Sequence, residues 1–307
     1  MAPPLDDRLV AAAAARLGAG GMHYSPRQLY YAACAMAERP VAGGSTVQLG
    51  CGGTMVLIAV VGGVLLSIYL GLLLIPALLL VNQGRITRRA ELNRPTTRPL
   101  AVGYQDFLAG HLDPLRAAHP ERLAGLLDTY SPPEGPGGTP LVVCDQAETA
   151  AVLNANLAAA GVAAHAVAAE AATARLAGET RVFCLHDADP SGCALPLRMR
   201  DRLPSAEVVD IGLRPGHIQG RRIPVLEGAP AVVGVELSGL LSPEEVVWLA
   251  DGRRVEVAIL GPAELVAAVG AAVDPQVRLR PSGTGRVLSV ERSPIPVVEI
   301  GPRPAGG

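Results

Sequence analysis

Several features are scarce or absent in this chain of 307 residues, and each absence narrows what the protein can do. Lysine does not occur, so arginine supplies the cationic side chains, and the formal net charge is −2. A slightly acidic chain has no general electrostatic attraction to nucleic acid. The five cysteines form no CxxC pair and the six histidines show no HxH or HExxH spacing, which indicates neither a zinc site nor a disulfide framework. Aromatic residues make up only 3% of the chain, so its core has to come from Val, Leu and Ala.

One uncharged stretch, Met55–Val81, is long enough to span a bilayer, which needs about 20 apolar residues. It predicts a single transmembrane helix within residues 54–82. Arg85, Arg88 and Arg89 follow this stretch, and cytoplasmic loops are enriched in such residues. We therefore expect a single-pass protein of the cell membrane whose C-terminal domain is cytoplasmic. Membrane lipid is the expected partner of these arginines.

Gly- and Pro-rich segments divide the chain into regions. We expect a helical N-terminal region at 1–40, a Gly-rich link at 41–53, the membrane helix at 54–82, a helical connector and linker at 83–139, an α/β domain at 140–281 and a C-terminal tail at 282–307. The strands expected are Leu141–Cys144, Ala163–Ala168, Arg181–Asp187, Glu207–Leu213, Val255–Leu260 and Val287–Val290. The helices expected include Leu5–Leu17, Ser25–Met36, Ala147–Ala160, Ala171–Ala177, Pro190–Leu203 and Ala263–Val273. This alternation predicts a parallel sheet with helices on both faces.

The most informative segment is RVFCLHDADPSG, residues 181–192. Its apolar start is typical of a buried strand, and the strand stops at Asp187 and Asp189. Carboxylates spaced i, i+2 at a strand end can point the same way, and two of them at the C-terminal edge of a parallel sheet suit Mg²⁺. The alternative is structural, with Asp189 or Ser191 capping the helix that follows. His186 precedes Asp187 and could be a site residue, but a packed or exposed histidine is expected.

Three segments, in order, resemble the A subunit of topoisomerase VI and its relatives that initiate meiotic recombination. They are SPRQLYY at 25–31, HDADPSG at 186–192 and VVDIGLRPGHIQGRRIPVLEG at 208–228. This family combines a winged-helix tyrosine domain with a Toprim metal domain. The resemblance implies a Toprim-like fold, with Tyr31 as the nucleophile and the Asp187 and Asp189 pair as ligands of Mg²⁺. Residues 1–40 would be a remnant of the winged helix.

The chain also departs from that family. The Toprim fold has a glutamate at the end of its first strand, and Cys144 stands there in this sequence. Asp145 is one residue further and, by strand alternation, is expected to face elsewhere. We therefore expect weak Mg²⁺ binding, which Asp145 or Glu148 could partly restore. A single membrane crossing would place Tyr31 outside the cell, away from Asp187, unless the N-terminal region packs on the C-terminal domain.

Three functions are compatible with these features. The first is a Toprim-like binding or scaffold module that does not cleave DNA and has a protein partner at the membrane. The second is a Mg²⁺-dependent nuclease or phosphoryl-transfer enzyme that uses Asp187 and Asp189. The third is a membrane-tethered DNA-binding protein that uses the arginines at 198–222. Nucleic acid is thus a partner in the second and third hypotheses.

Overall fold

The structure is a computed structural model that describes residues 5–37, 100, 102–128, 139–171, 181–218, 223–274, 279–282 and 287–290, all of them in one compact unit. The transmembrane helix predicted at 54–82 and the link at 41–53 lie outside these residues, as does the helix predicted at Ala171–Ala177 apart from its first residue. Within the described ranges, no helix has the length and apolar character that a membrane crossing needs.

A six-stranded sheet forms the centre of the α/β domain, in the order β2-β1-β3-β4-β8-β7. Its strands are β1 (Leu141–Cys144), β2 (His165–Ala168), β3 (Arg181–Leu185), β4 (Glu207–Asp210), β7 (Leu279–Ser282) and β8 (Val287–Val290). β7 pairs antiparallel with β8, and the other pairs are parallel. Leu141 stands beside Val182, and Val182 stands beside Val208. The predicted parallel sheet and the α/β class are therefore confirmed.

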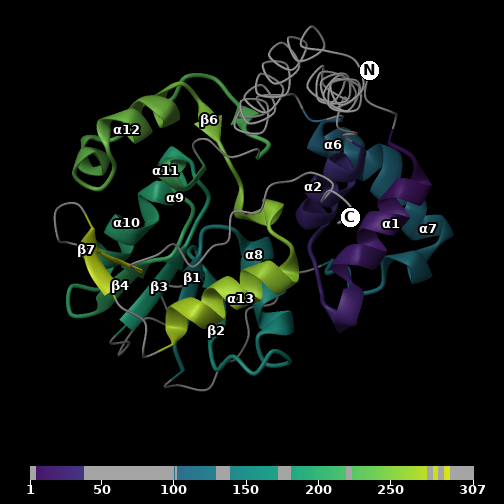
Figure 1. Cartoon of the computed structure of the whole chain (residues 1–307), viewed down its shortest axis with the longest axis horizontal. Coiled ribbons are helices and arrows are strands. Elements are labelled where there is room, and N and C mark those ends of the chain that lie inside the picture. The colour runs from purple at the N-terminus through teal and green to yellow at the C-terminus, as the bar shows by residue number, and fades with distance from the viewer. Residues whose placement is uncertain are drawn as a thin grey trace, which may run out of the picture. The chain divides into compact units, whose positions relative to one another are not determined.

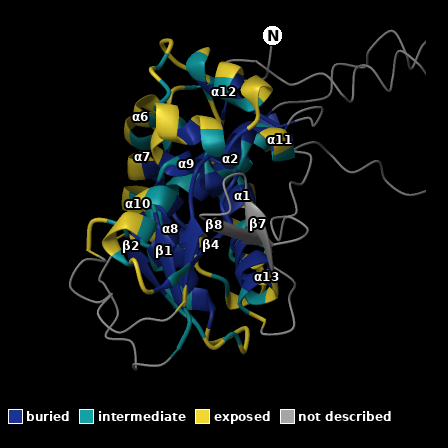
Figure 2. Cartoon of the chain, turned by 90° about the vertical axis from the view of Figure 1, so that its left-hand side faces the viewer, coloured by how far each residue is buried: buried dark blue, intermediate teal, exposed yellow. Residues whose placement is uncertain are grey.

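Helices cover both faces of the sheet (Figure 1). The helices α8 (Ala147–Asn156) and α13 (Pro262–Val273) lie on one face, and α10 (Leu195–Arg202) lies on the other. Strand residues alternate between these layers, as the pleat requires. Val142 and Cys144 belong to the hydrophobic cluster under α8 and α13, whereas Leu141 and Val143 pack with Leu195 of α10. Figure 2 shows the strands of this domain as a buried layer between helices whose outer sides are exposed.

The N-terminal region is helical, as predicted, and it packs on the α/β domain. It contains α1 (Asp7–Leu17), η1 (Ala19–Gly21) and α2 (Pro26–Ala37), and the described part of the connector adds α6 (Tyr104–Phe107), η2 (Leu108–Leu112), α7 (Asp113–Ala118) and η3 (Pro120–Leu123). A capping box opens α2, because the Gln28 amide donates to Ser25 Oγ at 3.1 Å and Gln28 Oε1 accepts from the Ser25 amide at 3.0 Å. Gln28 Nε2 also donates to the Leu260 carbonyl at 2.8 Å. Asn156 of α8 bonds both the amide and the carbonyl of His23, so two sets of polar contacts attach this region to the domain.

The remaining described elements correct three predictions. They are α9 (Pro190–Cys193), α11 (Pro215–Ile218), β5 (Leu226–Glu227), η5 (Val235–Gly239), α12 (Pro243–Ala250), β6 (Arg253–Arg254) and η6 (Val257–Ile259). The prediction of a strand at Val255–Leu260 is wrong, because the Val257 amide donates to the Asp187 carboxylate and not to a neighbouring strand. The predicted helix after Pro190 is split into α9 and α10, since Pro196 has no amide hydrogen to continue it. The sheet extends past residue 281, because β8 of the expected tail pairs with β4.

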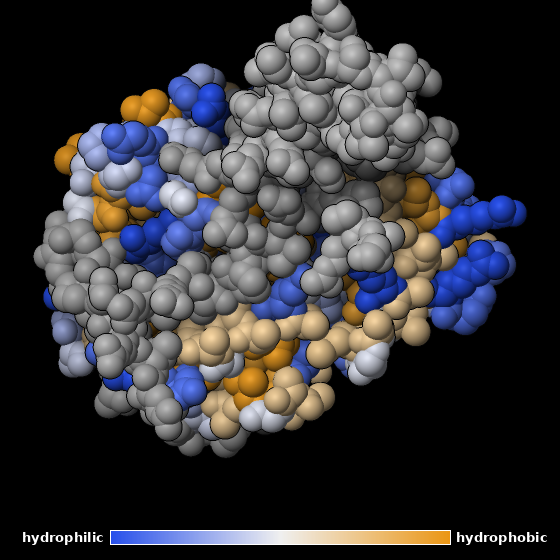
Figure 3. Space-filling view, viewed as in Figure 1, coloured by the Kyte–Doolittle hydropathy of each residue, from blue (hydrophilic) through white to orange (hydrophobic). Residues whose placement is uncertain are grey.

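The surface reflects the composition of these elements. Figure 3 shows weakly apolar side chains over α13, whose sequence PAELVAAVGAAV is rich in alanine. Trp248, Leu249 and the α13 residues Leu265 and Val269 point into the core instead. Small side chains thus face the solvent on α13, and the larger ones supply its buried contacts.

Candidate functional site

The sheet has a topological switch point between β1 and β3. The helix α8 follows β1 on one face of the sheet, and α10 follows β3 on the opposite face. The chain therefore leaves the carboxyl ends of these adjacent strands in opposite directions, which is where open α/β sheets bind ligands. Asp145 directly follows β1, and Asp187 comes two residues after β3. Both carboxyl groups are thus at the switch point.

Asp187 is 3% exposed and is held by its hydrogen bonds. Its Oδ1 accepts from the amide of Val257 at 2.6 Å. Its own amide donates to Asp145 Oδ2 at 2.6 Å, and Gln146 Nε2 lies 3.4 Å from its Oδ2. Burial raises the pKa of the Asp187 carboxyl well above its usual value, and the Asp145 carboxylate raises that pKa further. This arrangement favours a proton or a cation beside the two carboxyl groups.

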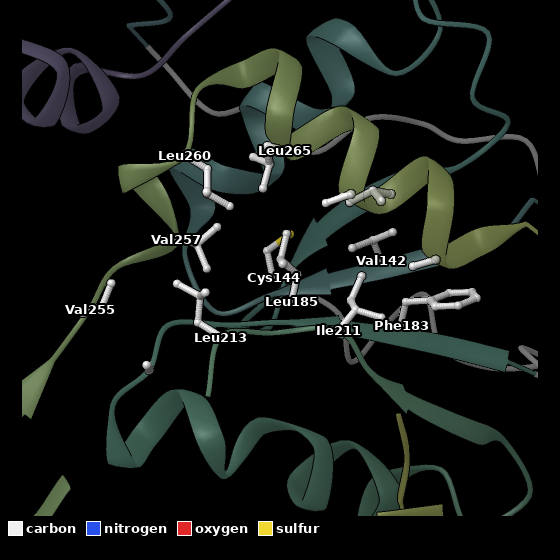
Figure 4. Packing of buried hydrophobic residues seen from close by; sticks show 14 of the residues in the cluster. Val142, Cys144, Phe183, Leu185, Ile211, Leu213, Val255, Val257, Leu260 and Leu265 are labelled. Atoms are coloured by element: carbon white, nitrogen blue, oxygen red, sulfur yellow. The ribbon is translucent and has the colours of Figure 1, made fainter. Parts of the chain in front are cut away.

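Asp145 faces Asp187, so the prediction that its side chain points elsewhere is wrong. The strand ends at Cys144, and from Asp145 the chain turns toward α8, so strand alternation no longer sets its direction. Burial raises the pKa of the Asp145 carboxyl to about 6. The hydrogen bond that this carboxyl accepts from the Asp187 amide lowers the pKa, but by less than burial raises it. Figure 4 shows Cys144 inside the hydrophobic core with Leu185 and Leu265. Cys144 is therefore a core residue, and Asp145 is the acidic residue at the end of β1 that faces Asp187.

Asp189 has a structural task in addition to its place in the motif. Its Oδ1 accepts from the Gly192 amide at 2.6 Å, which makes it the N-cap of α9. The structure therefore places Asp187 and Asp189 at the predicted strand end, but it gives each a different backbone partner. Asp189 thus caps α9, and its role as a ligand of Mg²⁺ stays a prediction.

Two carboxylate oxygens near the switch point are buried without a hydrogen-bond partner, Asp145 Oδ1 and Glu148 Oε2. Glu148 lies in the first turn of α8, three residues after Asp145. Buried acceptors of this kind are costly unless a proton, water or cation satisfies them. Across the described ranges, however, no three His, Cys, Asp or Glu side chains converge in a way that could hold a metal ion. The oxygens suit a cation chemically, but their present arrangement does not enclose one.

A buried charge network supports the loop between β3 and the switch point. His186 is fully buried, so of the packed and exposed alternatives the structure has the packed one. Its Nε2 lies 3.0 Å from Asp210 Oδ1, and its Nδ1 lies 2.8 Å from the Asp187 carbonyl. Arg214 donates to Asp210 Oδ2 from Nε at 2.9 Å and from Nη2 at 2.6 Å. Burial opposes the charge on His186, but Asp210 outweighs it and raises the pKa of the imidazole. The two ring nitrogens face a carbonyl oxygen and a carboxylate oxygen, so the network fixes the carbonyl of Asp187 beside the imidazole.

Gly212 is required for this network. A Cβ placed on Gly212 would lie 2.3 Å from His186 Cδ2, so any side chain there displaces the imidazole. The Gly212 amide also donates to Asp210 Oδ1 at 2.9 Å. The sequence patterns predict no role for Asp210, and Arg214 belongs only to the arginines of the DNA-binding hypothesis. Both residues lie in the segment VVDIGLRPG, which is part of the family resemblance.

Tyr31 lies on α2 and is 3% exposed. Burial raises the pKa of Tyr31 far above its usual value, and the nearby Glu256 carboxylate raises it further. Arg27, one turn earlier on α2, donates from Nη1 to both Glu256 oxygens at 2.8 Å. The Arg27 guanidinium also lies over the Tyr104 ring, 4.5 Å from its centroid. The Glu256 carboxylate therefore binds Arg27 of α2 and lies near Tyr31 of the same helix.

The same short segment connects Tyr31 with Asp187. Glu256 directly precedes Val257, whose amide bonds Asp187. The sequence left open whether the N-terminal region lies outside the cell or packs on the C-terminal domain. In the structure it packs on that domain. Arg27 and Glu256 are in contact, so these two regions lie together, and the crossing predicted at 54–82 lies outside the described residues and stays a prediction.

Comparisons with models of protein families, with curated proteins and with solved structures found no match. The functional proposal therefore rests on the carboxyl groups at the switch point and on the burial of Tyr31.

Proposed function

We propose that the protein is a membrane-associated Toprim-like protein, diverged from the A subunit of topoisomerase VI, that binds a partner and does not cleave DNA. Asp145 directly follows β1, one residue after the position of the family glutamate, and Asp187 and Asp189 follow the adjacent parallel strand β3. The N-terminal region and the α/β domain both lie on the cytoplasmic side, and residues 54–82 supply the membrane attachment.

The burial of Tyr31 is the observation that carries this proposal. A tyrosine nucleophile has to reach a phosphodiester and to transfer its proton to a base. Tyr31 is 3% exposed, and burial together with the nearby Glu256 carboxylate raises its pKa far above the usual value. A raised pKa and a buried hydroxyl both oppose nucleophilic attack.

The carboxylates of the site also accept hydrogen bonds from backbone amides. Asp145 accepts from the Asp187 amide, Asp187 accepts from the Val257 amide, and Asp189 accepts from the Gly192 amide. Each bond fixes a loop at the switch point, so these side chains shape a rigid edge of the domain. A rigid edge of this kind is suited to binding a partner.

The test is incubation of the full chain with supercoiled plasmid and Mg²⁺ or Mn²⁺, followed by a search for protein-linked DNA breaks. We expect the wild-type protein and Tyr31→Phe to give the same plasmid profile, with no covalent adduct. A covalent adduct that is lost in Tyr31→Phe would disprove the proposal.

A Mg²⁺-dependent phosphoryl-transfer enzyme is the second candidate, and the unpartnered oxygens favour it. Asp145 Oδ1 and Glu148 Oε2 are buried acceptors, and Asp145 bonds the Asp187 amide. Asp187 and Asp189 would hold the ion, Asp145 or Glu148 would complete its ligands, and a bound divalent cation would stabilise charge on a phosphate. The Asp187 carboxylate would have to give up its bond from the Val257 amide, which is why we expect weak binding.

Calorimetry with Mg²⁺ and Mn²⁺ separates the two candidates. The binding hypothesis expects no heat of binding at sub-millimolar cation. Tight binding by the wild-type protein, absent in Asp145→Asn and retained in the surface control Asp251→Asn, would favour the enzyme. The third hypothesis, DNA binding through the arginines at 198–222, predicts an affinity for DNA that falls steeply as the salt concentration rises. One of these arginines, Arg198, donates from Nη1 to the Ser191 carbonyl at 3.0 Å.

A further inference from the structure

We propose that residues 255–260, the bridge segment, transmit the position of helix α2 to the carboxyl group of Asp187. Helix α2 ends at Ala37, and the stretch predicted to cross the membrane, residues 54–82, follows it in the chain. The proposal rests on the proposed function, because it takes the carboxyl edge of the sheet as the surface that binds a partner. It adds a conformational coupling by which a displacement of α2 changes the support of that edge.

The bridge segment packs between two hydrophobic clusters. Val257 and Leu260 belong to the cluster of the α/β domain, where Figure 4 shows them near Leu265 of α13. Ala258 belongs to the cluster of the N-terminal region, and Ile259 packs against both clusters. Because protein interiors are close-packed, a shift of one cluster against this segment disturbs the contacts of the other.

Helix α2 is bonded to the bridge segment at two positions. Arg27 Nη1 donates to both oxygens of Glu256 at 2.8 Å, and Gln28 Nε2 donates to the Leu260 carbonyl at 2.8 Å. The Glu256 side chain is 13% exposed, so water competes little for its oxygens. Hydrogen bonds between charged groups are about twice as strong as neutral ones, so the Arg27 contact is the stronger of the two attachments.

The bridge segment is bonded to the site by its backbone. Val255 pairs with Ala188 in an isolated antiparallel bridge, in which the Ala188 amide donates to the Val255 carbonyl at 2.8 Å and the Val255 amide donates back at 3.2 Å. The Val257 amide donates to Asp187 Oδ1 at 2.6 Å. Glu256 lies between them with an extended backbone, φ −89° and ψ 143°, and in an extended chain the backbone groups of residues i and i+2 point to the same side.

The two peptide units on either side of Glu256 therefore carry bonds to the site. One contains the Val255 carbonyl that Ala188 bonds, and the other contains the Val257 amide that Asp187 bonds. A movement of Glu256 with Arg27 turns both units. Arg27 is thus a positioning residue for the Asp187 carboxyl, and loss of its contact should make these backbone bonds open more often.

Hydrogen–deuterium exchange of backbone amides, resolved to single residues by mass spectrometry on the full chain in detergent micelles, tests this coupling. We expect the amides of Val257 and Ala188 to exchange about tenfold faster in Arg27→Gln than in the wild-type protein. Arg116→Gln is the matched control, because Arg116 bonds Asp128 at 2.7 Å within the connector and should leave both amides as in the wild type. Unchanged exchange of Val257 and Ala188 in Arg27→Gln overturns the proposal.

A second variant, Glu256→Gln, and the double variant with Arg27→Gln show whether the two side chains act through one contact. Each single variant should speed the exchange of the Val257 amide, and the double variant should be no faster than either, because all three remove the same ion pair. An increase in the double variant that is the product of the two single increases overturns the proposal, since the side chains would then act independently.

The Ala166 amide distinguishes coupling from general loss of stability. It donates to Asn154 Oδ1 at 2.8 Å on β2, and it should exchange at the wild-type rate in every variant. An equal increase at Ala166 and at Val257 overturns the proposal, because the change would then be global. The plasmid assay stands apart, since a Tyr31 adduct in the wild-type protein disproves the proposed function whatever the exchange rates are.

Discussion

Replacing Asp210 by asparagine should destabilise the protein more than any surface change, because Asp210 is the shared anion of the buried network. Its side chain is 2% exposed and accepts from His186, Gly212 and twice from Arg214, over 2.6–3.0 Å. Breaking a buried ion pair by removing one partner costs about 3–5 kcal/mol. Asparagine keeps one acceptor oxygen, and the Arg214 side chain is 16% exposed, so we take the lower end, about 3 kcal/mol.

Thermal unfolding of the full chain followed by circular dichroism measures this cost. A loss of about 3 kcal/mol lowers the melting temperature by about 6–12 °C for a domain of this size. Asp251→Asn is the control, because Asp251 is 50% exposed and lies 3.6 Å from Arg253 at the surface. Surface ion pairs of this kind contribute about 0–1 kcal/mol. If Asp210→Asn melts within about a degree or two of the control, the buried ion pairs of Asp210 do not stabilise the fold by about 3 kcal/mol.

The same variant carries a prediction about pH. Burial by itself would raise the pKa of Asp210, but the charges on His186 and Arg214 outweigh burial and lower it. A carboxyl whose folded pKa is lowered contributes stability above its unfolded pKa of about 3.9 and loses that contribution as the pH falls toward the folded pKa. The wild-type protein should therefore lose stability more steeply than Asp210→Asn below about pH 4. Parallel pH profiles would contradict this assignment.

The other predictions concern the packing of the site and the placement of the two regions. Gly212→Ala should destabilise the protein by about 1–3 kcal/mol in urea unfolding, because the new Cβ overlaps the His186 ring, and wild-type stability would contradict the geometry. Cys144→Glu should destabilise the fold by about 3 kcal/mol or more without strengthening Mg²⁺ binding, because Cys144 is in the apolar core, and a gain in calorimetric Mg²⁺ affinity would show that it belongs to the site. Cysteines introduced at the exposed positions Ala12 and Ala159 should be labelled by an impermeant reagent from the same side of the membrane, and labelling from opposite sides would disprove the contact between these regions.

Local patterns predicted the sheet well and long-range contacts poorly. The strands at Leu141–Cys144 and Val287–Val290 follow from short apolar runs, and the structure has them with these bounds. The direction of Asp145 could not be predicted, because it depends on where β1 ends and the turn into α8 begins. Glu256 was missed because its partner Arg27 is 229 residues away, and no local periodicity indicates such a pair.

The central claim is that Tyr31 is buried against Glu256 and chemically silent, and a spectrophotometric titration of tyrosine tests it most directly. The pKa of Tyr31 is raised by burial and by the Glu256 carboxylate, so its folded form stays protonated where an ordinary tyrosine ionises, near pH 10. We predict that the wild-type protein and Tyr31→Phe, both still folded, show the same tyrosinate absorbance up to about pH 11. An extra tyrosinate in the wild-type protein, with a midpoint near pH 10 and absent from Tyr31→Phe, would contradict the account.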